Sequence, residues 1–196
     1  MRTIDHLYRS YNPEKEYAFV FDRRYTKDVA VALRPFSIKK DLFTFNKWIN
    51  EVFHTGYKKI NIPPYFDGSY FDITLPAPNT QSLWGLINEQ SSFQVDLYKA
   101  TEHQLPFREK GLMLSAGDVF MHVIISPRII GSSSAAWILP ACIDHCFRHK
   151  GVERIMLMND AHDIHYRELA EKASPSSHCP LKNGRSVYFY ELISSA

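Results

Sequence analysis

The sequence has little cysteine, with three residues among 196. An odd and low count argues against a disulfide scaffold and for a reducing compartment. Long hydrophobic runs are also missing, and the first residues, Met1–Tyr8, lack the apolar region of a signal peptide. We therefore expect a cytoplasmic protein that has no membrane partner.

An excess of charge of one sign is missing as well. The 23 lysines and arginines nearly balance the 21 aspartates and glutamates, and both signs are spread along the chain. Such a distribution provides no basic surface for nucleic acid. The hydrophobic content of 45% is enough for one substantial core. We expect residues 1–28 to be an N-terminal extension packed on a single domain at 29–196.

A recognisable metal-binding pattern is missing too. Cys142 and Cys146 lie four residues apart, with His145 and His149 nearby. Residues four apart share a helix face, but this spacing matches no common zinc motif, and cysteine is often buried. Core packing is the better interpretation, and we expect no metal.

The pattern of hydrophobic residues and turn residues predicts alternating strands and helices. Strands are expected at 29–36, 82–88, 92–99, 118–126, 154–159 and 186–192, with one further strand-like run at 17–21. Helices are expected from Ile38 after an N-cap at Ser37, at 135–150, and at 162–172. Residues 54–80 are predicted to form a long aromatic loop. This order indicates an α/β or α+β fold with a mixed, mostly antiparallel sheet flanked by helices.

The segment between the strand at 118–126 and the following helix carries the strongest functional signal. A loop of small residues, Gly131 to Ala135, opens directly into the helix, whose N-terminus offers unpaired N–H groups to an anion. The strand before it carries a titratable side chain, His122. Together they predict a site for a phosphorylated cofactor beside a base. Strand alternation should place Phe120, His122 and Ile124 on one face of the sheet.

Several short motifs, each present once, follow one another along the chain. They are Leu33-Arg-Pro-Phe36, Asp41-Leu42, Trp48-Ile-Asn50, Val95-Asp-Leu-Tyr98, Asp118 with His122, the loop from Pro127 to Ala135, Phe147, Val152-Glu-Arg-Ile-Met156 and Asp160. In this order they resemble the Gcn5-related N-acetyltransferases (GNAT superfamily) over residues 33–192. More narrowly, they resemble the branch that acylates N6-hydroxylysine in siderophore biosynthesis.

The resemblance implies a splayed GNAT sheet, acetyl-CoA or another acyl-CoA as co-substrate, and a small amine or hydroxylamine as acceptor. His122 and Asp160 match the positions of the two residues near the reacting centre in that branch. The residues implied to contact the cofactor are Val123, Ile124, Ile125, Gly131, Ser132, Ser133, Ser134 and Ala135. The residues implied to contact the acceptor are His54, Trp48 and Tyr98.

The residues leave several alternatives open. His122 could be a core histidine, and Asp160 could be the N-cap of the following helix. The start pattern around Leu33-Arg-Pro-Phe36 is also similar to that of aminoglycoside and ribosomal-protein N-acetyltransferases. Because serines replace the usual glycines of the cofactor loop, a catalytically silent module that binds CoA weakly is a third possibility.

Overall fold

The computed structural model describes residues 2–8, 18–54, 75–102, 113–160, 164–180 and 185–191, without the side chains of 2, 52–54, 102, 158–160 and 185. Three α-helices are described, α1 (Ile38–His54), α4 (Ile138–Phe147) and α5 (Ile164–Lys172), with 3-10 turns η1 (Ile4–His6), η3 (Ala100–Glu102) and η4 (Ser133–Trp137). The strands are β1 (Arg2–Thr3), β2 (Phe21–Arg24), β3 (Ala30–Pro35), β4 (Thr80–Ile87), β5 (Gln90–Lys99), β6 (Asp118–Ile125), β7 (His149–Lys150), β8 (Arg154–Asp160), β9 (Ser177–Pro180) and β10 (Arg185–Glu191).

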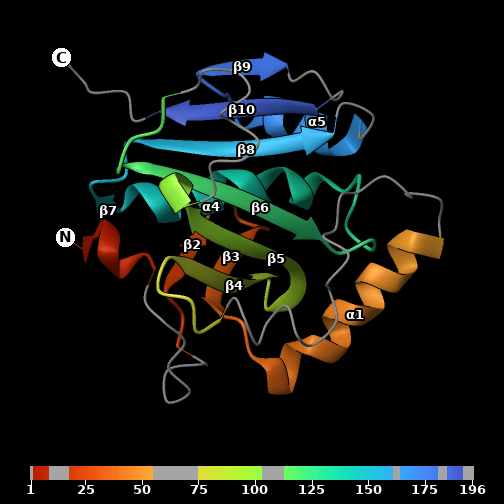
Figure 1. The fold of residues 1–196 in the computed structure, drawn as a ribbon. Coiled ribbons are helices and arrows are strands. Elements are labelled where there is room, and N and C mark those ends of the chain that lie inside the picture. Colours follow the sequence, from red (N-terminus) through yellow and green to blue (C-terminus); the bar gives the residue numbers. More distant parts are fainter. Residues whose placement is uncertain are drawn as a thin grey trace.

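One large sheet organises the molecule (Figure 1). Its eight strands run in the order β2-β3-β4-β5-β6-β8-β10-β9, and a separate short sheet pairs β1 with β7. Within the large sheet β6 and β8 run parallel, while the other neighbouring strands are antiparallel. The expected mixed, mostly antiparallel sheet flanked by helices is therefore confirmed.

The hairpin between β4 and β5 has a local cause in the sequence. Its two turn residues, Asn88 and Glu89, both have positive φ (49° and 67°). Two-residue turns of this kind match the twist of the flanking strands, and asparagine tolerates the left-handed conformation well. The Asn88 side chain also accepts a hydrogen bond from the Ala30 N–H and donates one to the Asp28 carbonyl. The turn is thereby tied to β3.

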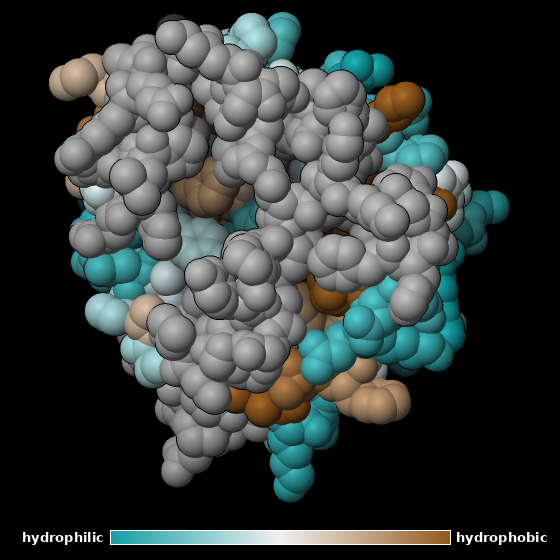
Figure 2. Space-filling view, turned by 45° about the vertical axis from the view of Figure 1, so that its right-hand side comes forward, coloured by the Kyte–Doolittle hydropathy of each residue, from teal (hydrophilic) through white to brown (hydrophobic). Residues whose placement is uncertain are grey.

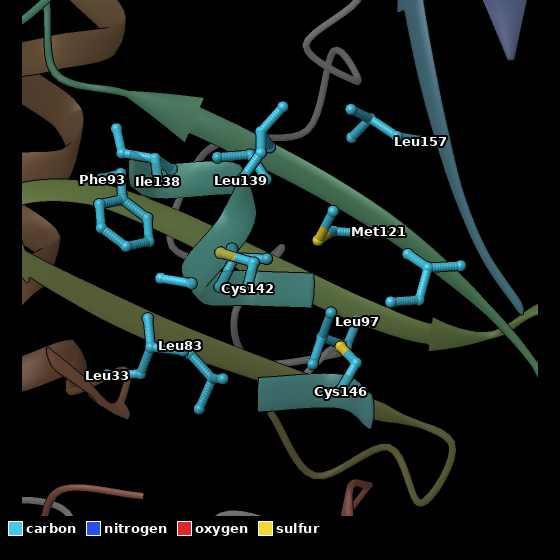
Figure 3. Packing of buried hydrophobic residues seen from close by; sticks show 14 of the residues in the cluster. Leu33, Leu83, Phe93, Leu97, Met121, Ile138, Leu139, Cys142, Cys146 and Leu157 are labelled. Carbon is cyan, nitrogen blue, oxygen red and sulfur yellow. The ribbon is translucent and has the colours of Figure 1, made fainter. Parts of the chain in front are cut away.

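The two faces of the sheet carry separate apolar layers. The α4 helix packs its buried residues on one face, among them Ile138, Leu139 and Cys142, against Leu83, Leu97 and Met121 of the sheet (Figure 3). The α5 helix joins the same layer through Ala170. On the opposite face, α1 packs Phe45, Trp48 and Ile49 against Trp84 and Ile124.

The N-terminal residues contribute to the sheet. Phe21–Arg24 pairs with β3 as an antiparallel strand, and Arg2–Thr3 pairs with β7. Leu7 is fully buried in the core layer under α4. Part of the segment at 1–28 is therefore built into the hydrogen-bonded architecture of the domain.

Some predicted boundaries are wrong. The helix expected at 135–150 is a 3-10 turn followed by α4, which ends at Phe147, because His149–Lys150 instead pairs with the N-terminal strand β1. The strand-like run at 17–21 gives way to β2, which begins at Phe21. The edge strand β9 was not predicted, because its sequence, Ser-His-Cys-Pro, has little strand character.

The surface of the described residues has no single large apolar area. The exposed large hydrophobic residues are scattered: Phe19, Ile38, Phe43, Met113 and Ile164. On the face shown in Figure 2, hydrophobic residues are visible in several separate areas. In the part of the chain that is described, no helix combines the length and apolarity needed to cross a membrane.

Candidate active site

The two parallel strands at the centre of the sheet separate partway along their length. The ladder between β6 and β8 covers Asp118–Met121 and Arg154–Leu157, whereas the strands continue to Ile125 and Asp160. Beyond Met121, β6 remains paired with β5 on its other side. Backbone groups on the β8 side of residues 122–125 therefore leave the ladder, which is the splay expected from the sequence.

His122 is the first residue of β6 beyond this point. Its strand alternates as predicted, since Met121, Val123 and Ile125 belong to the α4 layer, whereas Ile124 belongs to the α1 layer. His122 shares the face of Ile124 and is half-buried. Desolvation of the ring lowers the pKa of His122 from 6.5 to about 4. The imidazole is therefore neutral at physiological pH and able to accept a proton.

A row of polar residues crosses three strands at the same level. Ser82 of β4 lies opposite Asp96 of β5, and Asp96 lies opposite His122 of β6. The Asp96 carboxylate is 1% exposed and accepts hydrogen bonds from Ser82 Oγ and Gln94 Nε2, each at 2.5 Å. Burying a carboxylate is costly unless donors satisfy it, and these two donors supply part of that compensation.

Aromatic and apolar residues enclose the polar row on both sides. In the row above it, Trp84 stacks on Trp48 of α1 with ring centroids 4.6 Å apart. In the row below it, Tyr98 lies opposite Phe120, and their ring centroids are 6.0 Å apart. The polar groups are therefore held in surroundings of low polarity, where electrostatic interactions are stronger than in water.

The loop after β6 leads directly into η4 and α4. Gly131 adopts φ +81°, a conformation that favours glycine. Ser132 is the N-cap, and both its carbonyl and its hydroxyl accept from the Ala135 N–H. The Ser132 N–H donates to the Ile129 carbonyl. Among the described residues, the N–H groups of Ser133 and Ser134 donate to no backbone carbonyl, as is usual for the first turn of a helix.

The residues predicted to contact the acceptor substrate, and Asp160, have different surroundings in the structure. Trp48 is 4% exposed and stacked in the α1 layer, so its contacts are those of a core residue. Tyr98 is half-buried on the face that carries His122. His54 ends α1 and Asp160 ends β8, but both side chains lie outside the described residues. Their predicted roles stay predictions.

The backbone of the predicted cofactor residues is described throughout. Val123, Ile124 and Ile125 occupy the part of β6 that has left β8, and all three side chains are buried in the apolar layers. Any contact they make with a ligand is therefore through the backbone. The loop from Gly131 to Ala135 follows β6 in the chain, so it lies at the end of the sheet where β6 ends.

Sequence reasoning missed the polar residues beside His122. Gln94 and Asp96 alternate with Phe93, Val95 and Leu97, a pattern that is typical of a strand with one solvated face. Both polar side chains are nevertheless buried, on the face where α1 packs against Trp84 and Ile124. The available signal was the Val95-Asp-Leu-Tyr98 motif, but the motif does not indicate that Asp96 pairs with His122.

The cysteine and histidine cluster on α4 is part of the core. Cys142 and Cys146 are buried in the apolar layer, and desolvation raises the pKa of both thiols. His145 and His149 are also buried, and His149 Nδ1 lies 3.0 Å from the His145 carbonyl oxygen. The prediction of core packing for the two cysteines is confirmed. Among the described residues, no group of three or more candidate ligands could hold a metal ion.

Comparison with solved structures identifies the fold. The chain is similar to an uncharacterized protein from Bacillus halodurans (TM-score 0.68, 15% identity, covering 87% of this chain and 89% of that one). It is also similar to aminoglycoside acetyltransferase AAC(6')-Ib in complex with ribostamycin and coenzyme A (TM-score 0.65, 15% identity, 82% and 93% covered). A third similar structure is the GNAT domain of S. lividans PAT (TM-score 0.63, 12% identity, 93% and 100% covered). No family model and no curated protein matches the chain. At these identities the likeness shows a GNAT fold.

Proposed function

We propose that this protein is an acyl-CoA-dependent N-acyltransferase whose acceptor is a hydroxylamine or amine such as N6-hydroxylysine, as in siderophore biosynthesis. The observation that carries the proposal is the separation of β6 from β8 directly at His122, next to a loop that opens into a helix. Structures similar to this one contain coenzyme A, which supports the choice of co-substrate.

The loop after β6 fits the pyrophosphate of an acyl-CoA. The N–H groups of Ser133 and Ser134 head the helical segment without an acceptor in the described structure, and the side chains from Gly131 to Ala135 are small. A helix N-terminus attracts anions through such groups and through its dipole. Backbone groups of Val123, Ile124 and Ile125 on the β8 side suit hydrogen bonding to an extended amide chain.

Acyl-CoA supplies a thioester, and the protein has to remove one proton from the acceptor nitrogen. In this proposal neutral His122 accepts that proton as the nitrogen attacks the carbonyl carbon. With a pKa lowered to about 4, His122 is a weak base. A hydroxylamine suits a weak base better than an alkylamine, because an alkylamine is mostly an ammonium ion at neutral pH. This argument favours the hydroxylamine acceptor.

An aminoglycoside is the second candidate acceptor. It is favoured by the similarity to AAC(6')-Ib structures, one of which contains ribostamycin. Assays with acetyl-CoA and each of N6-hydroxylysine, lysine and kanamycin distinguish the candidates. We expect the highest kcat/KM with N6-hydroxylysine. His122→Ala should lower kcat by roughly 10²–10⁴-fold, with little change in the KM for acetyl-CoA, because the ring acts at the reacting centre.

Cofactor binding is tested separately by thermal unfolding with and without CoA. Binding to the folded state should raise the melting temperature. Ser133→Phe should abolish this increase, because the bulky side chain blocks approach to the helix start. Ser177→Phe is the matched control, since it is an exposed serine on the edge strand β9, and it should keep the response. CoA binding without turnover of any acceptor would support the silent module instead.

A further inference from the structure

We propose that Asp96 is the positioning residue for His122, and that its carboxylate stabilises the imidazolium formed during acyl transfer. This inference rests on the proposed function and extends it to the polar row Ser82–Asp96–His122. The resemblance instead implies Asp160 as the second residue near the reacting centre, and it gives Asp96 no role beyond its place in the Val95-Asp-Leu-Tyr98 motif.

The register of the sheet places the two side chains together. Asp96 and His122 are directly opposite each other on adjacent antiparallel strands, so both point to the same face. Directly opposed residues have Cβ atoms about 4.5–5.5 Å apart. In this proposal Asp96 acts on His122 as a charge that faces the ring from the neighbouring strand. Among the described side chains, no other acidic residue lies in register with His122.

The carboxylate is held in place by its neighbours. Ser82 Oγ and Gln94 Nε2 both donate to Asp96 Oδ1, from the adjacent strand and from the same strand. Both are buried, and Gln94 is fully so. A carboxylate fixed in this way needs little reorganisation when a positive charge appears opposite it. Preorganised charges of this kind are the ones that lower a barrier most effectively.

Among the described residues of α1, the side chains that pack on this face against Trp84 and Ile124 are apolar: Phe45, Trp48 and Ile49. The charged pair at the start of α1 is Arg34 with Asp41, joined by two hydrogen bonds of 2.6 and 2.7 Å. Arg34 lies two strands from β5, in the row of Trp84. The side chain of Asp160 on β8 is outside the described residues.

The proton balance of the step is complete with these groups. The acceptor nitrogen forms a bond to the acyl carbon and loses a proton to a ring nitrogen of His122. The bond from carbon to sulfur breaks, and CoA leaves as a thiolate. The imidazolium faces the Asp96 carboxylate during this interval, and it then returns the proton to the thiolate. Asp96 itself keeps its charge throughout.

The test replaces Asp96 by asparagine, which removes the charge but retains the shape. We expect Asp96→Asn to lower kcat by roughly 10- to 100-fold and to move the acid limb of the kcat/KM profile by about one pH unit to lower pH, because the imidazolium loses its counter-charge. The KM for acetyl-CoA should stay unchanged. Asp41→Asn is the matched control: its carboxylate is 3% exposed and on the same side of the sheet, and its loss should leave the acid limb in place.

A second measurement does not depend on catalysis. Nitrogen NMR of the histidine rings at neutral pH reports which ring nitrogen carries the proton. A carboxylate opposite His122 should favour one tautomer in the native protein, and Asp96→Asn should shift the ratio towards the other. A wild-type ring with both tautomers equally populated would overturn the proposal. So would an unchanged tautomer ratio in the variant.

These readouts separate the two proposals. If His122→Ala abolishes turnover while Asp96→Asn changes neither the acid limb nor the tautomer ratio, the role of Asp96 is refuted and the acyltransferase stands. If the tautomer ratio responds but no acceptor is turned over, the proposed function fails and the pairing of the two residues stands. Should Asp96→Asn not fold, equal populations of the two tautomers in the native protein would still overturn the proposal.

Discussion

Desolvation of the half-buried ring of His122 should make the stability of the protein depend on pH. Desolvation lowers its pKa in the folded state from 6.5 to about 4. The unfolded chain therefore binds a proton at this residue over a pH range in which the folded protein does not. The stabilisation is fully present above about pH 6.5, and it is lost as the pH falls towards 4, because protons then favour the unfolded state.

The size of the effect follows from the two pKa values. At pH 5.5 an unfolded histidine is about 90% protonated while the folded one is nearly neutral, which costs about 1.4 kcal/mol of unfolding free energy. Over the whole interval down to about pH 4 the loss approaches about 3 kcal/mol.

Urea unfolding near pH 7.5 and near pH 5.5 measures this loss. The other eight of the nine histidines also titrate, so the wild type has to be compared with His122→Gln, which does not titrate at this position. The wild type should lose about 1.4 kcal/mol more than the variant between the two pH values. Equal losses in the two proteins would show that water reaches the ring and that its pKa is ordinary. The reasoning from burial would then be refuted.

Two further predictions concern the sheet that carries the site. A Cβ added at Gly85 would lie 2.2 Å from the ring of Phe93, so Gly85→Ala should lower the free energy of unfolding in urea by roughly 1–3 kcal/mol. In a Phe93→Leu background the same substitution should lower it clearly less, and an equal loss would contradict the clash. The carboxylate of Asp118 is buried and accepts two hydrogen bonds from Arg154, at 3.0 and 2.6 Å. Asp118→Asn should therefore lower the free energy of unfolding by about 2–3 kcal/mol. This is less than for a fully buried pair, because the Arg154 side chain is 23% exposed. Asp144→Asn disrupts the pairs with Arg23 and Arg148, whose side chains are 52% and 48% exposed, so it should change stability less. A comparable loss would show that burial is not the cause.

Local sequence patterns determined the elements and their faces. Alternation in β6 correctly assigned Met121, Val123 and Ile125 to the face opposite Ile124, because side chains on a strand alternate whatever the partner strands are. The small residues from Gly131 to Ala135 indicated a helical segment after the strand, although its first turn is a 3-10 helix and α4 begins only at Ile138. The GNAT fold followed from the order of short motifs, each of which is a local feature.

Tertiary structure decided which residues share the site. The pairing of Asp96 with His122 depends on the register between β5 and β6, and no local pattern encodes that register. The polar residues Gln94 and Asp96 of β5 looked solvated in the sequence, but both are buried in the structure. They lie on the face where α1, about fifty residues earlier in the chain, packs against Trp84 and Ile124. The same packing makes Trp48 a core residue, since it stacks on Trp84. The point at which β6 leaves β8 is likewise a property of strand pairing, because hydrogen bonds between distant segments determine where a ladder ends.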